Sequence, residues 1–105
     1  MKGRVLVFST VARAEDAERI ARELVERRLA ACVNVVAAVS SVYRWKGRVE
    51  SDEERLLLIK TRAEHFEALR ETLVALHPYE LPEAIAVPIE AGHEPYLEWI
   101  DESVR

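Results

Sequence analysis

The chain has 105 residues, of which 50% are hydrophobic, so it is long enough for one domain, residues 1–105, with a single packed core. Its net charge of -4 argues against a nucleic-acid partner, because nucleic acids bind basic surfaces. No apolar run approaches the roughly 18 residues that span a bilayer, which argues against a membrane-spanning helix.

The N-terminus and the residue usage bear on where the protein works. Met1–Arg4 leads straight into Val5–Phe8, an apolar run that is too short for a signal peptide and lacks a small-residue cleavage site. We therefore expect a cytoplasmic protein. The single cysteine, Cys32, excludes an intramolecular disulfide and a CxxC motif. Glutamine is absent, asparagine occurs once and 32% of the residues are charged, a composition that fits a thermophilic source.

Apolar periodicity and turn residues predict four strands and three helices. In chain order they are a strand at Arg4–Thr10, a helix at Ala14–Leu29, a strand at Cys32–Trp45, a strand at Arg48–Thr61, a helix at Ala63–Leu76, a strand at Ala84–Ile89 and a helix that starts near Pro95. Lys46-Gly47 is the predicted hairpin turn, because glycine adopts positive φ without a steric cost. Pro78 ends the second helix.

This order predicts an α+β fold, a ferredoxin-like βαββαβ sandwich with a long β-hairpin and an extra C-terminal helix. Right-handed crossovers favour the spatial strand order 4-1-3-2. That order places the fourth strand at an edge. Pro88 independently requires an edge, since proline has no N–H to donate to a neighbouring strand.

The hairpin is long for so small a domain. Fourteen residues of strand span about 46 Å at roughly 3.3 Å each, whereas a globule of this length has a diameter of roughly 30–35 Å. An exposed edge that ends in Tyr43 and Trp45 is prone to aggregate unless it is covered. We therefore expect a closed homo-oligomer joined through the hairpin. The alternative is a bent hairpin that packs on its own helices.

The segment His77–Glu83 is the first candidate site, because it combines a histidine, a tyrosine, two glutamates and two prolines. At the end of a helix the dipole favours a charged His77, and a neutral imidazole is a common metal ligand. A capping or hydrogen-bonding role is the alternative. Glu80 and Glu83 would add carboxylates to a divalent-cation site. We interpret the acidic run Glu50–Glu54 as a solvated flank of the hairpin.

Other chemistry-bearing residues have two interpretations each. Cys32 is either an inert core residue or a soft-metal or redox ligand. The aromatic residues form either an interface core or a ligand pocket, and tyrosine and tryptophan are enriched in interfaces; they are Tyr43, Trp45, Tyr79 and Trp99. No nucleophile elbow, P-loop, HExxH or dinucleotide-binding motif is present, so we do not expect an enzyme.

Five motifs together resemble the CutA divalent-cation tolerance family over nearly the whole chain. They are Ala30-Ala31-Cys32-Val33-Asn34, Ser41-Val42-Tyr43-Arg44-Trp45-Lys46-Gly47, Ile59-Lys60-Thr61, His77-Pro78-Tyr79-Glu80-Leu81-Pro82-Glu83 and Tyr96-Leu97-Glu98-Trp99. The resemblance implies a ferredoxin-like protomer in a homotrimer with exchanged hairpins, and a link to tolerance of copper and other divalent metals. It also implies an architecture similar to the trimeric PII signalling proteins, with clefts between subunits.

The resemblance directs the functional prediction. We expect weak binding of Cu²⁺ or another divalent cation at inter-subunit clefts, with no obligatory cofactor. Ser9 and Leu76 stand where family members proposed to bind copper carry cysteine and histidine. The alternatives are a PII-like sensor of an anionic metabolite, whose charge would come from Lys60 and the arginines, and a structural trimer that acts through a protein partner. The predicted site residues are His77 and Cys32 for metal, Asn34, Lys60, Tyr79 and Glu83 for the ligand cleft, and Tyr43, Trp45 and Trp99 for the trimer interface.

Overall fold

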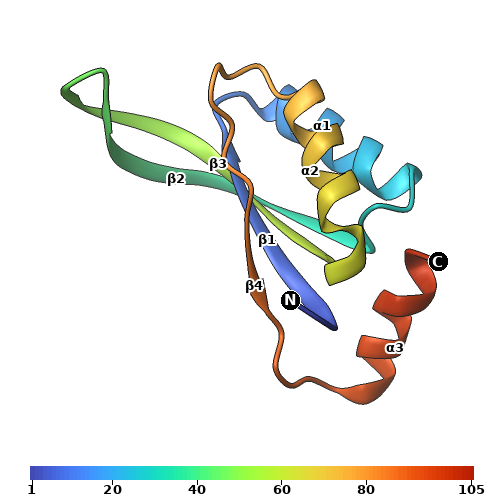
Figure 1. Cartoon of the computed structure of the whole chain (residues 1–105). Helices are drawn as coiled ribbons and strands as arrows, with labels where there is room; N and C mark the ends of the chain where they lie inside the picture. The colour runs from blue at the N-terminus through green and yellow to red at the C-terminus, as the bar shows by residue number, and fades with distance from the viewer.

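A computed structural model of the chain, residues 1–105, has one four-stranded sheet with two helices packed on one face (Figure 1). The strands are β1 (Arg4–Val11), β2 (Cys32–Trp45), β3 (Arg48–Arg62) and β4 (Ile85–Pro88). The helices are α1 (Ala14–Glu26), α2 (Phe66–Leu76) and α3 (Glu94–Ser103), and a 3₁₀ turn, η1 (Ala63–His65), precedes α2. All neighbouring strands are antiparallel, in the order β2-β3-β1-β4. The predicted fold class and strand order are confirmed.

Helix α1 ends earlier than its apolar periodicity predicts, at Glu26 instead of Leu29. Arg28 adopts φ 58°, the left-handed conformation. Its N–H donates to the Val25 carbonyl at 3.0 Å, and the Leu29 N–H donates to the Leu24 carbonyl at 3.0 Å. This pair of bonds is a Schellman motif, which ends the helix and still folds Leu29 against the core.

The core lies between the sheet and the two helices α1 and α2. Alternate residues of β1 face it and are fully buried, as the period of a strand requires. Eleven buried residues form this cluster: Val5, Val7, Val11, Ala17, Ile20, Leu24, Ala30, Leu57, Ile59, Leu69 and Leu73. Ser9 shares this face, and its buried hydroxyl has no hydrogen-bond partner.

The hairpin of β2 and β3 projects away from the helices (Figure 1). Lys46 and Gly47 have φ values of 50° and 79°, so the predicted two-residue turn has positive φ at both central positions. A register shift between Val36 and Val39 marks a bulge in β2. Near the tip, Val42 and Val49 are 70% and 66% exposed. The hairpin therefore does not pack on its own helices.

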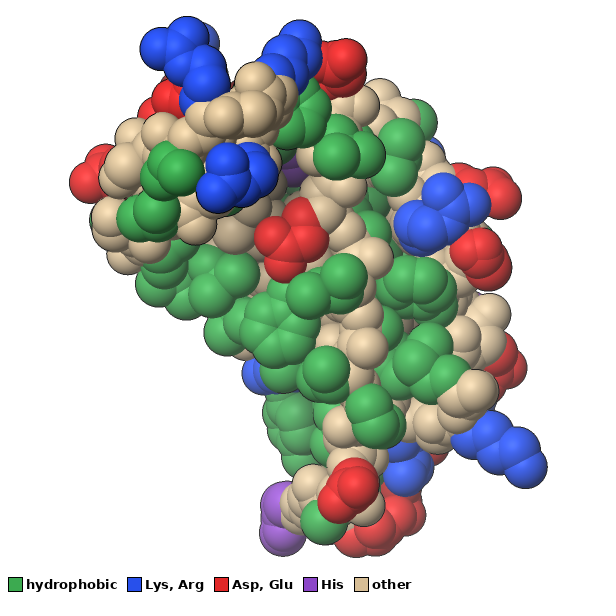
Figure 2. Space-filling view, turned by 60° about the vertical axis from the view of Figure 1, so that its left-hand side comes forward, with side chains coloured by type: hydrophobic (Ala, Val, Ile, Leu, Met, Phe, Trp, Pro, Cys, Tyr) green, Lys and Arg blue, Asp and Glu red, His purple; other side chains and the backbone are tan.

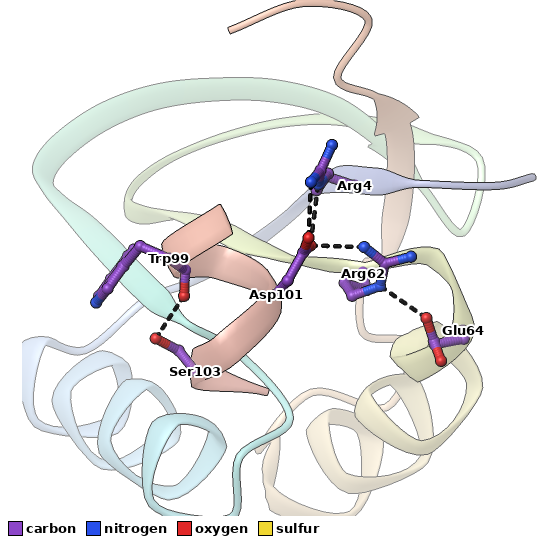
Figure 3. A network of polar contacts seen from close by, with 6 residues as sticks. All are labelled: Arg4, Arg62, Glu64, Trp99, Asp101 and Ser103. Atoms are coloured by element: carbon purple, nitrogen blue, oxygen red, sulfur yellow. Dashed lines mark hydrogen bonds and ion pairs between the residues drawn. The ribbon is translucent and has the colours of Figure 1, made fainter. Parts of the chain in front are cut away.

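Helix α3 is fastened to the end of the sheet by an ionic network (Figure 3). The Arg4 guanidinium donates to Asp101 through Nε at 2.9 Å and Nη2 at 2.6 Å. Arg62 donates to the same carboxylate at 2.5 Å and to Glu64 at 2.7 Å. The hydrogen bonds from the two arginines lower the pKa of Asp101 to about 2.

The second face of the sheet is largely uncovered. The register places Phe8 opposite Leu58 on one side and opposite Ile85 on the other, so their side chains share this face. Ile85 and Val87 are 56% and 43% exposed. Figure 2 shows hydrophobic side chains gathered across the middle of the molecule, below the hairpin. A monomeric soluble protein rarely exposes a large contiguous apolar surface.

Candidate functional site

A cleft of about 760 Å³ lies between the outer half of the hairpin and the segment that joins α2 to β4. It is lined by Thr10 of β1, by Ser40, Ser41, Val42, Tyr43, Arg44 and Trp45 of β2, by Glu54 of β3, and by Tyr79, Glu80, Leu81 and Glu83 of the joining segment. The predicted segment therefore does form a cleft wall, and the aromatic half of the hairpin forms the opposite wall.

His77 anchors this segment from behind the cleft. The residue is 7% exposed. The Tyr79 backbone N–H donates to His77 Nδ1 at 3.1 Å, so Nδ1 is an acceptor and Nε2–H donates to the Thr10 carbonyl at 2.8 Å. Both ring nitrogens are thus occupied, which leaves no lone pair for a metal in this conformation. Prolines on both sides of the tyrosine stiffen the segment that His77 holds.

The helix dipole, which favours a charged His77, is opposed by burial of the side chain. Burial lowers the pKa of His77, and this effect outweighs the hydrogen bond to Thr10 and the negative charge of Asp16 and Glu54, which act in the opposite direction. The imidazole is therefore neutral near pH 7, since its ordinary pKa is 6.5. Desolvation decides the outcome because the ring lies beneath the 77–83 segment instead of at an open helix end.

Glu54 is the residue that sequence reasoning missed. It belongs to the acidic run expected to be solvated, yet it is only 6% exposed. The Tyr79 hydroxyl donates to Glu54 Oε2 at 2.5 Å. Burial, followed by this hydrogen bond, raises the pKa of Tyr79. None of the ion pairs of the chain involves Glu54, so its charge is buried without a basic partner.

The remaining polar groups of the cleft are more exposed than Glu54. The Tyr43 hydroxyl donates to Asp52, which raises the pKa of Tyr43 to about 12. Lys46 lies 3.8 Å from Glu80, and both side chains are mostly exposed. The Thr10 hydroxyl lies 3.5 Å from Glu83. The lining thus carries three glutamates and one guanidinium, that of Arg44, so the cleft is acidic.

The other predicted cleft residues lie elsewhere. Cys32 and Lys60 are partners in the β2–β3 register. Lys60 pairs in turn with Leu6 of β1, four residues and about 13 Å along the strand from Thr10. The Lys60 ammonium donates to the Tyr96 hydroxyl at 3.2 Å and lies 5.5 Å from the centre of that ring. The predicted cleft is therefore divided between the two ends of the sheet.

The two predicted metal ligands and the three predicted interface residues are also separated. Cys32 is half-buried beside Asn34, with 3.9 Å between Sγ and Oδ1, far from His77. No group of three or more histidine, cysteine, aspartate or glutamate side chains is placed to hold a metal ion. Tyr43 and Trp45 line the cleft, whereas Trp99 lies on α3 and is 42% exposed.

Together these features define a small ferredoxin-like protein with a projecting hairpin that forms one wall of an acidic, aromatic cleft. Comparison with known proteins identifies the family. The family model described as CutA1 divalent ion tolerance protein matches residues 5–103. The chain belongs to this family, as the five motifs predicted.

Curated relatives support the assignment. The chain is 50% identical over 98 residues to the divalent-cation tolerance protein CutA of Thermus thermophilus, a match that covers 93% of this chain and 95% of that protein. It is 46% identical over 101 residues to the chloroplastic protein CutA of Arabidopsis thaliana, with 96% of this chain covered. The match spans only 56% of the Arabidopsis protein.

Solved structures agree. The CutA structure from Xylella fastidiosa superposes with a TM-score of 0.94 at 48% identity and covers 97% of this chain and 98% of that one. A structure described as the periplasmic divalent cation tolerance protein CutA from Archaeoglobus fulgidus has a TM-score of 0.94 at 40% identity and covers 97% of this chain and 99% of that one. In the present chain, no helix combines the length and apolar character needed to cross a membrane.

Proposed function

We propose that this chain forms a homotrimer that binds divalent cations weakly in clefts between its subunits. Membership of a family described by divalent ion tolerance carries the proposal. The acidic cleft supports it, because Glu54, Glu80 and Glu83 line it with carboxylate oxygens and the Thr10 hydroxyl lies 3.5 Å from Glu83. The uncovered apolar face of the sheet supports the oligomer, since a partner would bury it.

A single chain holds no complete metal site, so we propose that other donors complete the coordination shell. Carboxylates without a third protein donor bind a divalent cation weakly unless water or another subunit completes the shell. His77 keeps the cleft wall in place and does not serve as a ligand, because both its nitrogens are occupied. We propose that the protein is cytoplasmic and that it binds its ligand without catalysing a reaction. Some relatives are described as chloroplastic or periplasmic, so the cytoplasmic location stays a prediction.

Calorimetric titration with MnCl₂ and with CuCl₂ tests the metal proposal. We expect a weak, saturable signal that falls in Glu83→Gln and is unchanged in Glu90→Gln, which makes the same charge change at an exposed residue outside the cleft. Sedimentation velocity at micromolar concentration tests the assembly. Absence of saturable binding would refute the metal proposal, and a monomer would refute the trimer.

Small-molecule binding is the second candidate function, and one observation favours it. The cleft of about 760 Å³ is far larger than a metal ion needs and falls in the range of small-molecule sites, roughly 300–1,000 Å³. The sequence predicts that a sensor would bind an anion through Lys60 and the arginines. The cleft does not fit that ligand, because Arg44 is the only arginine in its lining, its charge is mainly negative and Lys60 lies elsewhere.

A further inference from the structure

We propose that the cleft binds an organic ammonium cation, with Glu54 as its counter-ion and the rings of Tyr43, Trp45 and Tyr79 as its walls. This inference rests on the small-molecule function and names the chemical class of the ligand. Three features carry it: a buried carboxylate without a basic partner, the aromatic lining, and the size of the space.

Glu54 is a buried charge without a compensating charge. The residue is only 6% exposed, and its carboxylate belongs to no ion pair. Burying a carboxylate is costly unless a cation or several donors offset the lost hydration. The chain supplies one neutral donor, the Tyr79 hydroxyl, to Oε2.

The second carboxylate oxygen, Oε1, is the atom that a ligand would reach. It accepts no hydrogen bond from the chain, since the bond from Tyr79 is the only one made to Glu54. It is also not enclosed, because the only fully buried side-chain polar atom without a partner is the hydroxyl oxygen of Ser9. Glu54 is a lining residue of the cleft, so the exposed part of its side chain is open to a ligand there.

The aromatic walls distinguish an organic cation from a metal ion. An ammonium group is attracted to the faces of tyrosine and tryptophan rings, and its alkyl carbons gain from contact with them. A divalent metal ion takes oxygen, nitrogen or sulfur ligands and gains nothing from such walls. Tyr43 and Trp45 come from β2 and Tyr79 comes from the joining segment, so rings flank the cleft on both sides.

The charge of the lining distinguishes a cation from an anion. Glu80 and Glu83 line the cleft beside Glu54, against the single guanidinium of Arg44. Lys46, at the hairpin turn, lies 3.8 Å from Glu80 and partly neutralises only that outer carboxylate. An anionic ligand would meet net repulsion, whereas an ammonium group would bring the positive charge that Glu54 lacks.

Titration of the whole protein with n-butylammonium chloride, in EDTA to remove metals, tests the proposal. The matched neutral probe is 1-butanol, which keeps the alkyl chain without the charge. Calorimetry gives the affinity, and the fluorescence of Trp45 reports occupancy in a Trp99→Phe background. We expect saturable binding of n-butylammonium and none of 1-butanol at the same concentrations.

Four variants locate the site. Glu54→Gln should weaken n-butylammonium binding about tenfold or more, because it removes the counter-ion. Trp45→Leu and Tyr43→Leu should each weaken it by about threefold or more, because they remove a ring. Glu53→Gln makes the same charge change on the neighbouring residue, outside the cleft lining, and should leave the affinity unchanged. Circular dichroism checks that each variant is folded; should Glu54→Gln fail to fold, the Tyr43 and Trp45 variants carry the test.

The outcomes also separate this inference from metal binding. Trp45→Leu should weaken n-butylammonium binding and keep the Mn²⁺ signal of the wild type. Equal binding of 1-butanol, wild-type affinity in Glu54→Gln, or wild-type affinity in both ring variants would overturn the ammonium site. A missing Mn²⁺ signal alongside n-butylammonium binding would refute the metal proposal and leave the ammonium site standing.

Discussion

Asp101→Asn tests the ionic network that fastens α3 to the sheet (Figure 3). Arg4 and Arg62 together donate three hydrogen bonds to this carboxylate, at 2.9, 2.6 and 2.5 Å. Asparagine keeps the size of the side chain and removes the charge and one acceptor. The two guanidinium groups would then lose a shared partner but stay partly solvated, since their side chains are 23% and 28% exposed.

The pKa of Asp101 gives the magnitude. A fall from 3.8 to about 2 corresponds to about 2 kcal/mol, at roughly 1.4 kcal/mol for each pKa unit. The Asp101 side chain is 21% exposed, so solvent screening reduces this value, and we expect a loss of about 1–2 kcal/mol in the free energy of unfolding at pH 7.

The pH dependence follows from the direction of the shift. Because the folded state lowers the pKa of Asp101, its contribution is fully present well above pH 3.8 and is lost as the pH falls toward about 2. The difference between wild type and Asp101→Asn should therefore shrink toward zero at the acidic end. Urea denaturation at fixed protein concentration, followed by circular dichroism at pH 7 and near pH 2.5, measures both values.

The matched control is Glu102→Gln, which changes the charge of the next residue, an exposed one with no ion pair. A loss in Asp101→Asn no larger than that in Glu102→Gln would refute the reasoning. So would a difference from wild type that stays constant down to pH 2.5, because the effect would then not come from the ionised carboxylate.

Three further predictions follow from the core and the cleft. Tyr79→Phe removes the hydroxyl that donates to buried Glu54, so the free energy of unfolding should fall by about 1–3 kcal/mol, against a smaller change in Tyr96→Phe at an exposed ring. Burial lowers the pKa of His77 below 6.5, so the free energy of unfolding of the wild type should fall as the pH drops through and below 6.5. This pH dependence should disappear in His77→Gln and remain in His93→Gln. Leu73→Ala, at a fully buried core position, should cost about 2–5 kcal/mol by urea denaturation.

Elements set by local chemistry could be predicted from the sequence. The Lys46-Gly47 turn fixed the hairpin, and β2 spans Cys32–Trp45 as predicted. Pro88 lies in β4 at the sheet edge, where its missing N–H costs no ladder bond. These features depend on the dihedral preferences and donors of one or two residues, which the sequence states directly.

Residues whose state depends on distant neighbours could not be predicted. Glu54 looked solvated in an acidic run, and it is buried because the Tyr79 hydroxyl and the 77–83 segment fold over it from 25 residues away. A partial signal existed, since Glu54 lies two residues from Leu56 on one face of β3. His77 likewise depends on Thr10, at the end of β1, for its second hydrogen bond.

The two proposals for the cleft differ in whether binding requires assembly of the subunits, and Ile85→Glu distinguishes them. Divalent-cation binding needs donors that a single chain lacks, whereas the carboxylate and rings for an ammonium group all come from one chain. Ile85 is 56% exposed on the uncovered sheet face, so a glutamate there should disfavour a partner subunit without disturbing the core. We expect sedimentation to report a smaller species that has lost the Mn²⁺ signal and still binds n-butylammonium. An assembly of wild-type size would show that the subunits do not meet through this face, and loss of both ligands from a folded monomer would show that the cleft itself needs a second chain.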